Sequence, residues 1–246
     1  MRLFTADLHV HTALSPCAAD EMTPPRIVAE ALREGLDMIA VCDHNSARNV
    51  AAVQAAAGAR LAVLAGMEIT SAEECHVLGL FPDAAAAEAA ADEAGATLPP
   101  VDDGYVAFFG AQTVLDAGGA PAGAETRALA MATALDVDQV VALVHGHGGL
   151  AVAAHIDRKA FGVIGQLGVF PAETGFDAVE LSRHVAPGSA RERELSAFGL
   201  AVLRSSDSHF PEDLGAARTK LALESASFAE LRLALRGEQG RRVGRA

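Results

Sequence analysis

The stretch Arg2-Leu3-Phe4-Thr5-Ala6-Asp7-Leu8-His9-Val10-His11 begins as a mostly apolar run and ends in an acid and two histidines. On an extended segment, residues two apart point to the same side, so the imidazoles of His9 and His11 can reach one ion. Imidazole nitrogens suit zinc, manganese or iron better than calcium or magnesium. The stretch therefore predicts a β-strand that delivers two metal ligands to one edge of a sheet.

Similar apolar runs recur along the chain and alternate with helix-like stretches. The further strands are expected at residues 38–42, 61–69, 76–81, 150–154, 178–181, 200–204 and 220–223. Helical spacing of apolar residues follows Thr23, Ala47, Asp136 and Ser227. The strands are continuously apolar, as in parallel sheets that are covered on both faces. This alternation predicts an α/β fold, either a barrel or an open sheet.

One segment interrupts the alternation. Residues 82–133 begin with an alanine-rich run and continue through a proline- and glycine-containing stretch, which indicates a helical or irregular insertion. We expect residues 1–81 and 134–240 to form the main domain and residues 241–246 to form a frayed tail.

Composition limits the partners. The chain has 246 residues and a formal net charge of −13, which argues against binding of long nucleic acid through a basic face. One tyrosine, no tryptophan and ten phenylalanines argue against base-stacking platforms.

The sequence contains no apolar run of about 18 residues, so no membrane partner is expected. The early charged residues and the three cysteines without a CxxC pair favour a reduced, cytoplasmic protein. Oligomeric state cannot be inferred from the sequence.

Histidines and acids gather at the ends of the predicted strands, and six of the nine histidines lie there. The set comprises His9, His11, His44, Glu68, His76, His155, Asp207 and His209. The carboxyl ends of parallel strands face the active site in such folds. So many buried imidazoles and carboxylates require a counter-charge, and the set is too large for one ion, so about two or three divalent metals are expected. Such a cluster suits phosphoester hydrolysis. Phosphate-binding glycine loops and a GxSxG nucleophile motif do not occur in the sequence.

The segments Asp7-Leu8-His9-Val10-His11-Thr12, Val41-Cys42-Asp43-His44-Asn45, Gly66-Met67-Glu68-Ile69, Ala154-His155 and Ser206-Asp207-Ser208-His209 together resemble the motifs of the polymerase and histidinol phosphatase (PHP) family, in order and in approximate spacing. The resemblance implies a distorted (β/α)7 TIM-like barrel that binds up to three ions of manganese, iron or zinc and acts as a stand-alone phosphoesterase.

The resemblance also implies roles for individual residues. A first metal is expected on His9, His11, Glu68 and Asp207. A second is expected on Glu68, His76 and His155, and a third on His44 and His209. Many family members have another acidic or histidine ligand shortly after the HxH pair. Asp20 is the best candidate here, ahead of Glu21 and Cys17. Glu68, Asp207 and His209 are the expected catalytic residues, and Asp7 and Asp43 are expected to orient imidazoles.

Basic side chains near the ligands are candidates for binding phosphate. Arg158 is the first choice and Arg183 the second, because a guanidinium can grip two phosphate oxygens; Lys159 and His184 are further options. The expected substrate is a small phosphorylated molecule such as a nucleotide, a nucleoside bisphosphate or a short oligonucleotide. Histidinol phosphate and sugar phosphates are alternatives. A non-catalytic metal-binding regulatory module is the alternative of another class. A metal-dependent amidohydrolase is disfavoured because no lysine stands at a strand end.

Overall fold

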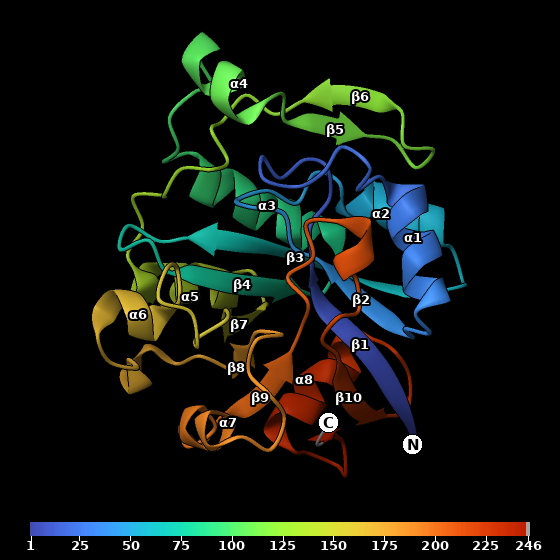
Figure 1. Cartoon of the computed structure of the whole chain (residues 1–246), viewed down its shortest axis with the longest axis vertical. Coiled ribbons are helices and arrows are strands. Elements are labelled where there is room, and N and C mark those ends of the chain that lie inside the picture. The colour runs from blue at the N-terminus through green and yellow to red at the C-terminus, as the bar shows by residue number, and fades with distance from the viewer. Residues whose placement is uncertain (245–246) are drawn as a thin grey trace.

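The computed structural model describes residues 1–244, and most of its strands belong to one curved sheet (Figure 1). The strands are β1 (Arg2–Val10), β2 (Met38–Val41), β3 (Ala62–Thr70), β4 (His76–Phe81), β5 (Thr113–Leu115), β6 (Pro121–Ala124), β7 (Leu150–Ala153), β8 (Ala178–Leu181), β9 (Ala201–Arg204), β10 (Thr219–Leu223) and β11 (Arg242–Gly244). The helices are α1 (Pro24–Arg33), α2 (Val50–Ala57), α3 (Ala84–Gly95), α4 (Asp103–Phe109), α5 (Val137–Gly146), α6 (Val163–Leu167), α7 (Ala190–Leu195) and α8 (Phe228–Arg236).

The main sheet is a nearly closed barrel. Its strand order is β11-β10-β1-β2-β3-β4-β7-β8-β9, and β5 pairs with β6 in a separate hairpin. A parallel bridge from Val10 to Ser208 connects the end of β1 with the segment that follows β9. The predicted α/β barrel is therefore confirmed, and every predicted strand is present within a few residues of its expected bounds.

The sheet is not wholly parallel, which differs from the sequence expectation. Strand β4 runs antiparallel to β3 and β7, and β10 runs antiparallel to β1. The connection from β3 to β4 spans only residues 71–75. So short a link permits a hairpin but not the crossover that parallel neighbours need. The hairpin pairs His76 with Thr70, which brings the first residue of β4 to the edge where β3 ends.

Local sequence signals set the helix starts. Pro24 and Pro25 occupy the first positions of α1, where a missing N–H costs nothing. Asp136 and Gln139 form a reciprocal capping box at the start of α5. The Ser227 side chain accepts a hydrogen bond from the Glu230 N–H at the start of α8.

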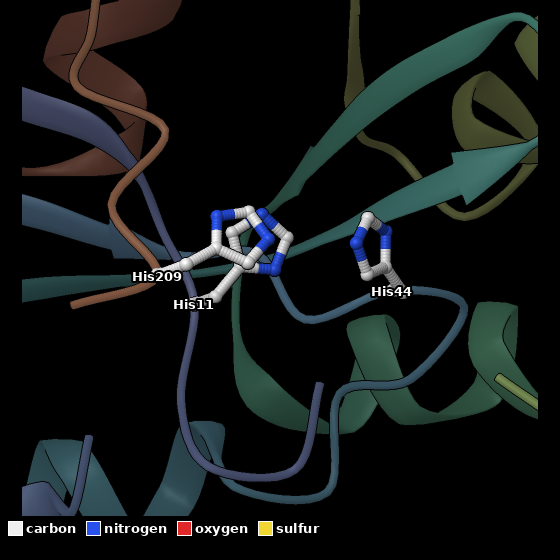
Figure 2. A group of neighbouring side chains, drawn as sticks. All are labelled: His11, His44 and His209. Carbon is white, nitrogen blue, oxygen red and sulfur yellow. The ribbon is translucent and has the colours of Figure 1, made fainter. Parts of the chain in front are cut away.

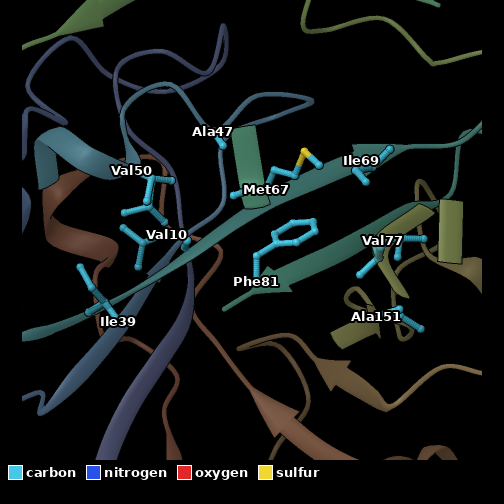
Figure 3. Close-up of a cluster of buried hydrophobic side chains, with 14 of the residues drawn as sticks. Val10, Ile39, Ala47, Val50, Met67, Ile69, Val77, Phe81 and Ala151 are labelled. Carbon is cyan, nitrogen blue, oxygen red and sulfur yellow. The ribbon is translucent and has the colours of Figure 1, made fainter. Parts of the chain in front are cut away.

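Apolar side chains pack on both faces of the sheet. On the outer face, Ile39, Met67 and Ile69 pack with residues of the surrounding helices and with Phe81 (Figure 3). On the inner face, Leu64 belongs to a cluster that also includes α8 residues. Because side chains alternate along a strand, Glu68 shares the face of Leu64. The barrel interior is thus apolar along most of β3 and carries a carboxylate near its end.

The segment predicted as an insertion divides into two parts. Helix α3 buries Ala87, Ala90, Ala91 and Ala94 in the outer apolar cluster, so the alanine-rich run packs as a barrel helix rather than as an added one. Small alanine side chains let this helix approach the sheet closely. The remainder, 96–133, carries α4 and the β5–β6 hairpin, which lie together at one end of the molecule (Figure 1).

The C-terminal residues also differ from the expected tail. Strand β11 pairs with β10 from Ala222 to Lys220, so residues 242–244 belong to the sheet. Residues 245–246 of the predicted tail lie outside the described residues. None of the helices in the described part of the chain is long and apolar enough to span a membrane.

Candidate metal centre

The polar residues from the strand ends converge at one mouth of the barrel. Three groups of side chains each place their donor atoms within 4.8 Å of one another. The groups are His9, His11, Glu68 and Asp207; His44, Glu68 and His76; and His11, His44 and His209. Figure 2 shows the third group, with residues from three distant parts of the chain facing one another. Every member was singled out from the sequence.

Glu68 is the hub of the cluster. Its Oε1 lies 2.8 Å from His76 Nδ1, 3.0 Å from His155 Nε2 and 3.4 Å from His9 Nε2. Its Oε2 lies 3.0 Å from His44 Nδ1 and 3.4 Å from His11 Nε2. Burial opposes ionisation of this carboxyl, but the neighbouring His76 and His9 outweigh it and hold the pKa of Glu68 well below its usual value. A carboxylate with both oxygens surrounded in this way suits a bridge between two cations.

Asp207 completes the group around His9 and His11. Its Oδ1 lies 3.4 Å from His9 Nε2 and 3.2 Å from His11 Nε2, and these two nitrogens are 3.1 Å apart. Such separations match those between ligands around one ion, because bonds of about 2.1 Å place neighbouring ligands roughly 3 to 3.5 Å apart. Asp207 has a φ of +52°, a conformation that is uncommon for residues other than glycine. The surrounding structure holds this carboxylate at the mouth at a cost in backbone strain.

Hydrogen bonds to the Nδ1 atoms of His9 and His11 leave the Nε2 atoms, which face the cluster, available as ligands. Glu180 Oε1 lies 3.1 Å from His9 Nδ1, and Ser15 Oγ lies 2.9 Å from His11 Nδ1. The Ser15 hydroxyl donates to Asp43 Oδ1, so it can only accept from His11. Each Nδ1 therefore carries the proton in the neutral ring, and the two Nε2 lone pairs point at each other.

The residues fit divalent cations. Among residues 1–244, the buried atoms that form no well-directed hydrogen bond include Glu68 Oε2, Asp207 Oδ1 and His76 Nδ1, although each lies within 3.2 Å of another donor atom of the cluster. Buried polar atoms are rarely left in this state, so something must satisfy them. Burial opposes protonation of His11, but Asp207 and Glu68 raise its pKa to about 8. Unsatisfied carboxylate oxygens and a raised imidazole pKa both fit a site that attracts positive charge, and imidazole and carboxylate donors are the set that zinc, manganese and iron bind.

The pKa of His209 shifts in the direction opposite to those of His9, His11 and His44, which are raised. Its ring stacks on that of His11 (Figure 2), and the two ring centroids are 4.0 Å apart. Burial and then the neighbouring His11 lower the pKa of His209 to about 3. The imidazole is therefore neutral near pH 7, which suits a metal ligand better than a general acid.

The two aspartates expected to orient imidazoles form hydrogen bonds with other groups instead. Asp7 accepts hydrogen bonds from Ser206 N at 3.0 Å and Gly215 N at 2.8 Å, so it anchors the loop that carries Asp207. Burial raises the pKa of Asp7 to about 6. Asp43 accepts from the Thr12 N–H at 2.7 Å and from the Ser15 hydroxyl, and it acts on His11 through Ser15.

Sequence reasoning missed Glu180 and Ser15. Glu180 lies within β8, is fully buried, and also accepts a hydrogen bond from the His155 N–H at 3.2 Å. The sequence signal for Glu180 is its position as the single acid in the otherwise apolar strand Ala178–Leu181. Ser15 had no sequence signal apart from its position four residues after His11.

Asp20, the expected additional ligand, does not join the cluster. It is exposed and lines a cavity of about 430 Å³ together with Ser15 and Phe109. The turn in which the Ala18 N–H bonds to the Ser15 carbonyl instead brings Cys17 Sγ to 3.2 Å from His44 Nε2. Glu21 is exposed as well.

The two candidate phosphate-binding arginines have acidic partners. Arg158 Nη1 lies 2.6 Å from Asp207 Oδ2, so this guanidinium is at the cluster itself. Arg183 Nη1 lies 2.5 Å from Asp213 Oδ1, which raises the pKa of Arg183 above its usual value. Both arginine side chains are about one-third exposed, at 34% and 33%.

Comparison with protein families identifies the chain. A model of the PHP domain matches residues 7–163, and a model of a PHP-associated region matches residues 191–239. The chain belongs to the PHP family. A search of curated proteins finds no match. Family membership supports the expectation of a hydrolase whose histidines and carboxylates can bind metal.

Solved structures with the same fold include a lesion-specific endonuclease, PfuEndoQ from Pyrococcus furiosus, with a TM-score of 0.71 and 17% identity. The match covers 98% of this chain but 58% of that one, so this chain spans less than two thirds of the endonuclease. Another is a protein from Bifidobacterium adolescentis that is proposed to be a metal-dependent phosphoesterase, with a TM-score of 0.58, 24% identity, and coverage of 83% of this chain and 87% of that one.

A further structure corrects the expectation about partners. Endonuclease Q in complex with a 27-mer duplex that carries an abasic lesion matches with a TM-score of 0.69 and 15% identity, covering 98% of this chain and 58% of that one. The exclusion of long nucleic acid, which rested on the net charge of −13, is therefore wrong. Net charge averages over the whole surface, whereas binding depends on the local field, which divalent ions and nearby arginines can reverse.

Proposed function

We propose that this chain hydrolyses a phosphoester bond with the help of divalent metal ions held by the Glu68-centred cluster. The observation that carries the proposal is the crowding of imidazoles and carboxylates around Glu68, where buried donor atoms form no well-directed hydrogen bond. A non-catalytic module with an eroded site would lack several of these ligands. Completeness therefore favours an enzyme over the regulatory module.

The geometry supports a division of the ligands into overlapping sites for two to three ions. His9, His11, Glu68 and Asp207 would hold one, and Glu68, His76 and His155 a second. His44 and His209, with His11 nearby, would hold a third. Manganese, iron and zinc all suit this donor set. When bound, such ions lower the pKa of water and neutralise charge on a phosphoryl group.

The residues of the chain itself prepare the site. Glu180 and the Asp43–Ser15 pair fix the rings of His9 and His11 so that each presents Nε2 inward. Asp7 fixes the loop of Asp207. Arg158 stands at the mouth, where its guanidinium can leave the Asp207 carboxylate and bind phosphoryl oxygens. Arg183, which pairs with Asp213, would add a second cationic contact to the substrate.

The substrate is a phosphomonoester or phosphodiester, and a nucleotide or a nucleic-acid strand fits as well as a sugar phosphate. The structural likeness to an endonuclease complex favours testing a strand as well as small esters. The test is release of phosphate or alcohol from a panel of mono- and diesters, with the metal-stripped protein reloaded separately with manganese, iron or zinc. We expect turnover that disappears when the metals are removed. Turnover by a verified metal-free preparation, or none with any ion, would contradict the proposal.

A further inference from the structure

Phe161 presents an aromatic surface beside the cluster. Its ring stacks on the imidazole of His76, with centroids 4.5 Å apart and an interplanar angle of 19°. The residue is nevertheless 42% exposed, so the ring is only partly used for packing. His76 in turn contacts Glu68. An apolar ring is thus open to solvent one side chain away from the hub of the proposed metal site.

The backbone holds Phe161 in place. Its φ of +61° is rarely adopted by aromatic residues, and its carbonyl accepts a hydrogen bond from the His76 N–H at 2.8 Å. At the next residue, Gly162, a Cβ atom would come within 2.5 Å of the Arg158 carbonyl oxygen. Left-handed conformations of this kind persist only where the surroundings impose them, and they gather at functional sites. The backbone at Phe161 is therefore constrained, and the stacking contact with His76 sets the orientation of the ring.

The same short loop carries Arg158. This guanidinium contacts Asp207 at 2.6 Å, while Phe161 contacts His76, which belongs to a different ligand group of the cluster. One segment, residues 158–161, therefore carries both a guanidinium that can bind phosphoryl oxygens and a flat apolar ring. A ligand that uses both must join a phosphate to a planar ring.

We propose that Phe161 stacks on a nucleobase, or on a comparable planar ring, attached to the phosphoester that the cluster binds. This inference rests on the proposed function, since it takes the cluster as the phosphate site. The scarcity of aromatic residues argued against an extended stacking platform, but a single placed ring suffices for one base. Stacking tolerates any base, so Phe161 would favour ligands that carry a planar ring over ligands that lack one, without distinguishing among the bases.

The test compares binding of two non-hydrolysable phosphonate analogues, one of adenosine 5′-monophosphate and one of ribose 5-phosphate, by calorimetry on the metal-loaded protein. We expect the adenosine analogue to bind about tenfold more tightly. Phe161→Ala should remove this preference without weakening binding of the ribose analogue, and Phe161→Trp should restore it. Phe108→Ala, at an 81% exposed phenylalanine of α4, is the matched control and should keep the preference.

Measuring the metal content of Phe161→Ala distinguishes stacking on the ligand from a role in which Phe161 only covers His76. If Phe161 merely covers His76, Phe161→Ala will lose metal and weaken both analogues equally, and the inference is overturned. Equal affinity of the wild-type protein for both analogues overturns it as well. A single-stranded oligonucleotide in place of the nucleotide analogue shows whether the base belongs to a strand or to a free nucleotide, and the Phe161 dependence is expected in either case.

Binding and turnover can fail independently. A base preference that depends on Phe161, combined with no hydrolysis of any ester under any metal, would support the stacking role and refute the proposed function. Hydrolysis without a base preference would refute the stacking role alone.

Discussion

His76 Nδ1 lies 2.8 Å from Glu68 Oε1, although the two residues belong to strands that run in opposite directions. The β3–β4 hairpin places the first residue of β4 beside the last residue of β3, so a strand beginning and a strand end share one edge of the barrel. Glu68 thereby gains His76 as a partner. In a uniformly parallel barrel the first residue of the next strand would lie at the opposite edge of the sheet. The same edge carries the whole candidate metal centre.

Replacement of Glu68 should abolish metal-dependent activity. In Glu68→Gln, the amide keeps the shape but cannot bridge two cations, so we expect at least about a 100-fold loss of turnover together with loss of bound metal. Elemental analysis and a phosphate-release assay measure the two effects. Glu88→Gln, at an exposed position of α3, is the control and should behave as wild type. Full metal content and activity in Glu68→Gln would rule out its role as a bridge.

Glu180→Gln should weaken metal binding without removing a ligand. The neutral amide still accepts a hydrogen bond from His9 Nδ1 but no longer increases the basicity of Nε2, so we expect a fall in metal affinity of roughly tenfold or more. Competition with a chromogenic chelator gives the affinity. Glu173→Gln, at an exposed acid elsewhere, serves as the control. An unchanged affinity would mean that Glu180 plays no part in orienting His9.

Metal affinity should rise with pH. Asp207 and Glu68 raise the pKa of His11 to about 8 against the opposing effect of burial, and Cys17 and Glu68 likewise raise that of His44 to about 9. Below these values, an incoming cation must displace protons, so its apparent affinity increases as pH rises from about 6 to 9 and then levels off.

The stability of the metal-free protein should fall as pH rises, whereas its metal affinity increases. A histidine whose pKa is raised on folding stabilises the native state most fully below its unfolded value, which is 6.5, and this contribution is lost as pH rises through 8 to 9. The difference in Tm between the metal-loaded and metal-free forms should therefore widen over this range in thermal unfolding. A difference independent of pH would contradict the assignment of these histidines as ligands.

Arg158→Ala should impair substrate binding but spare the metals. Loss of a charge-assisted contact to phosphate predicts a fall in kcat/KM of about 10- to 100-fold, carried mainly by KM, with metal content unchanged. Arg158→Lys should recover only part of the loss, because an ammonium cannot grip two oxygens. Arg191→Ala, at a partly exposed arginine of α7, is the control. Unchanged steady-state kinetics in Arg158→Ala would leave this arginine without a role in phosphate recognition.

Much of the fold could be predicted from the sequence because its signals are local. Apolar runs such as Met38–Val41, the prolines at the start of α1 and the cap at Asp136 act within a few residues. The short strands β5, β6 and β11 were not predicted. In β6, Pro121–Ala124 is exposed along its length and carries no alternating apolar pattern. The burial of α3 was also missed, because an alanine-rich helix looks the same in sequence whether it packs or not.

The sequence by itself determined which side chains could carry the chemistry: histidines and acids at strand ends, in the order that marks the PHP family. Only the tertiary structure decided how they are used. It made Glu68 the hub, brought Glu180 from β8 behind His9, excluded Asp20, and set Phe161 on His76. The physical reason is distance along the chain. Glu180 and His9 are 171 residues apart, and such a contact depends on sheet order and strand direction, which no local pattern encodes.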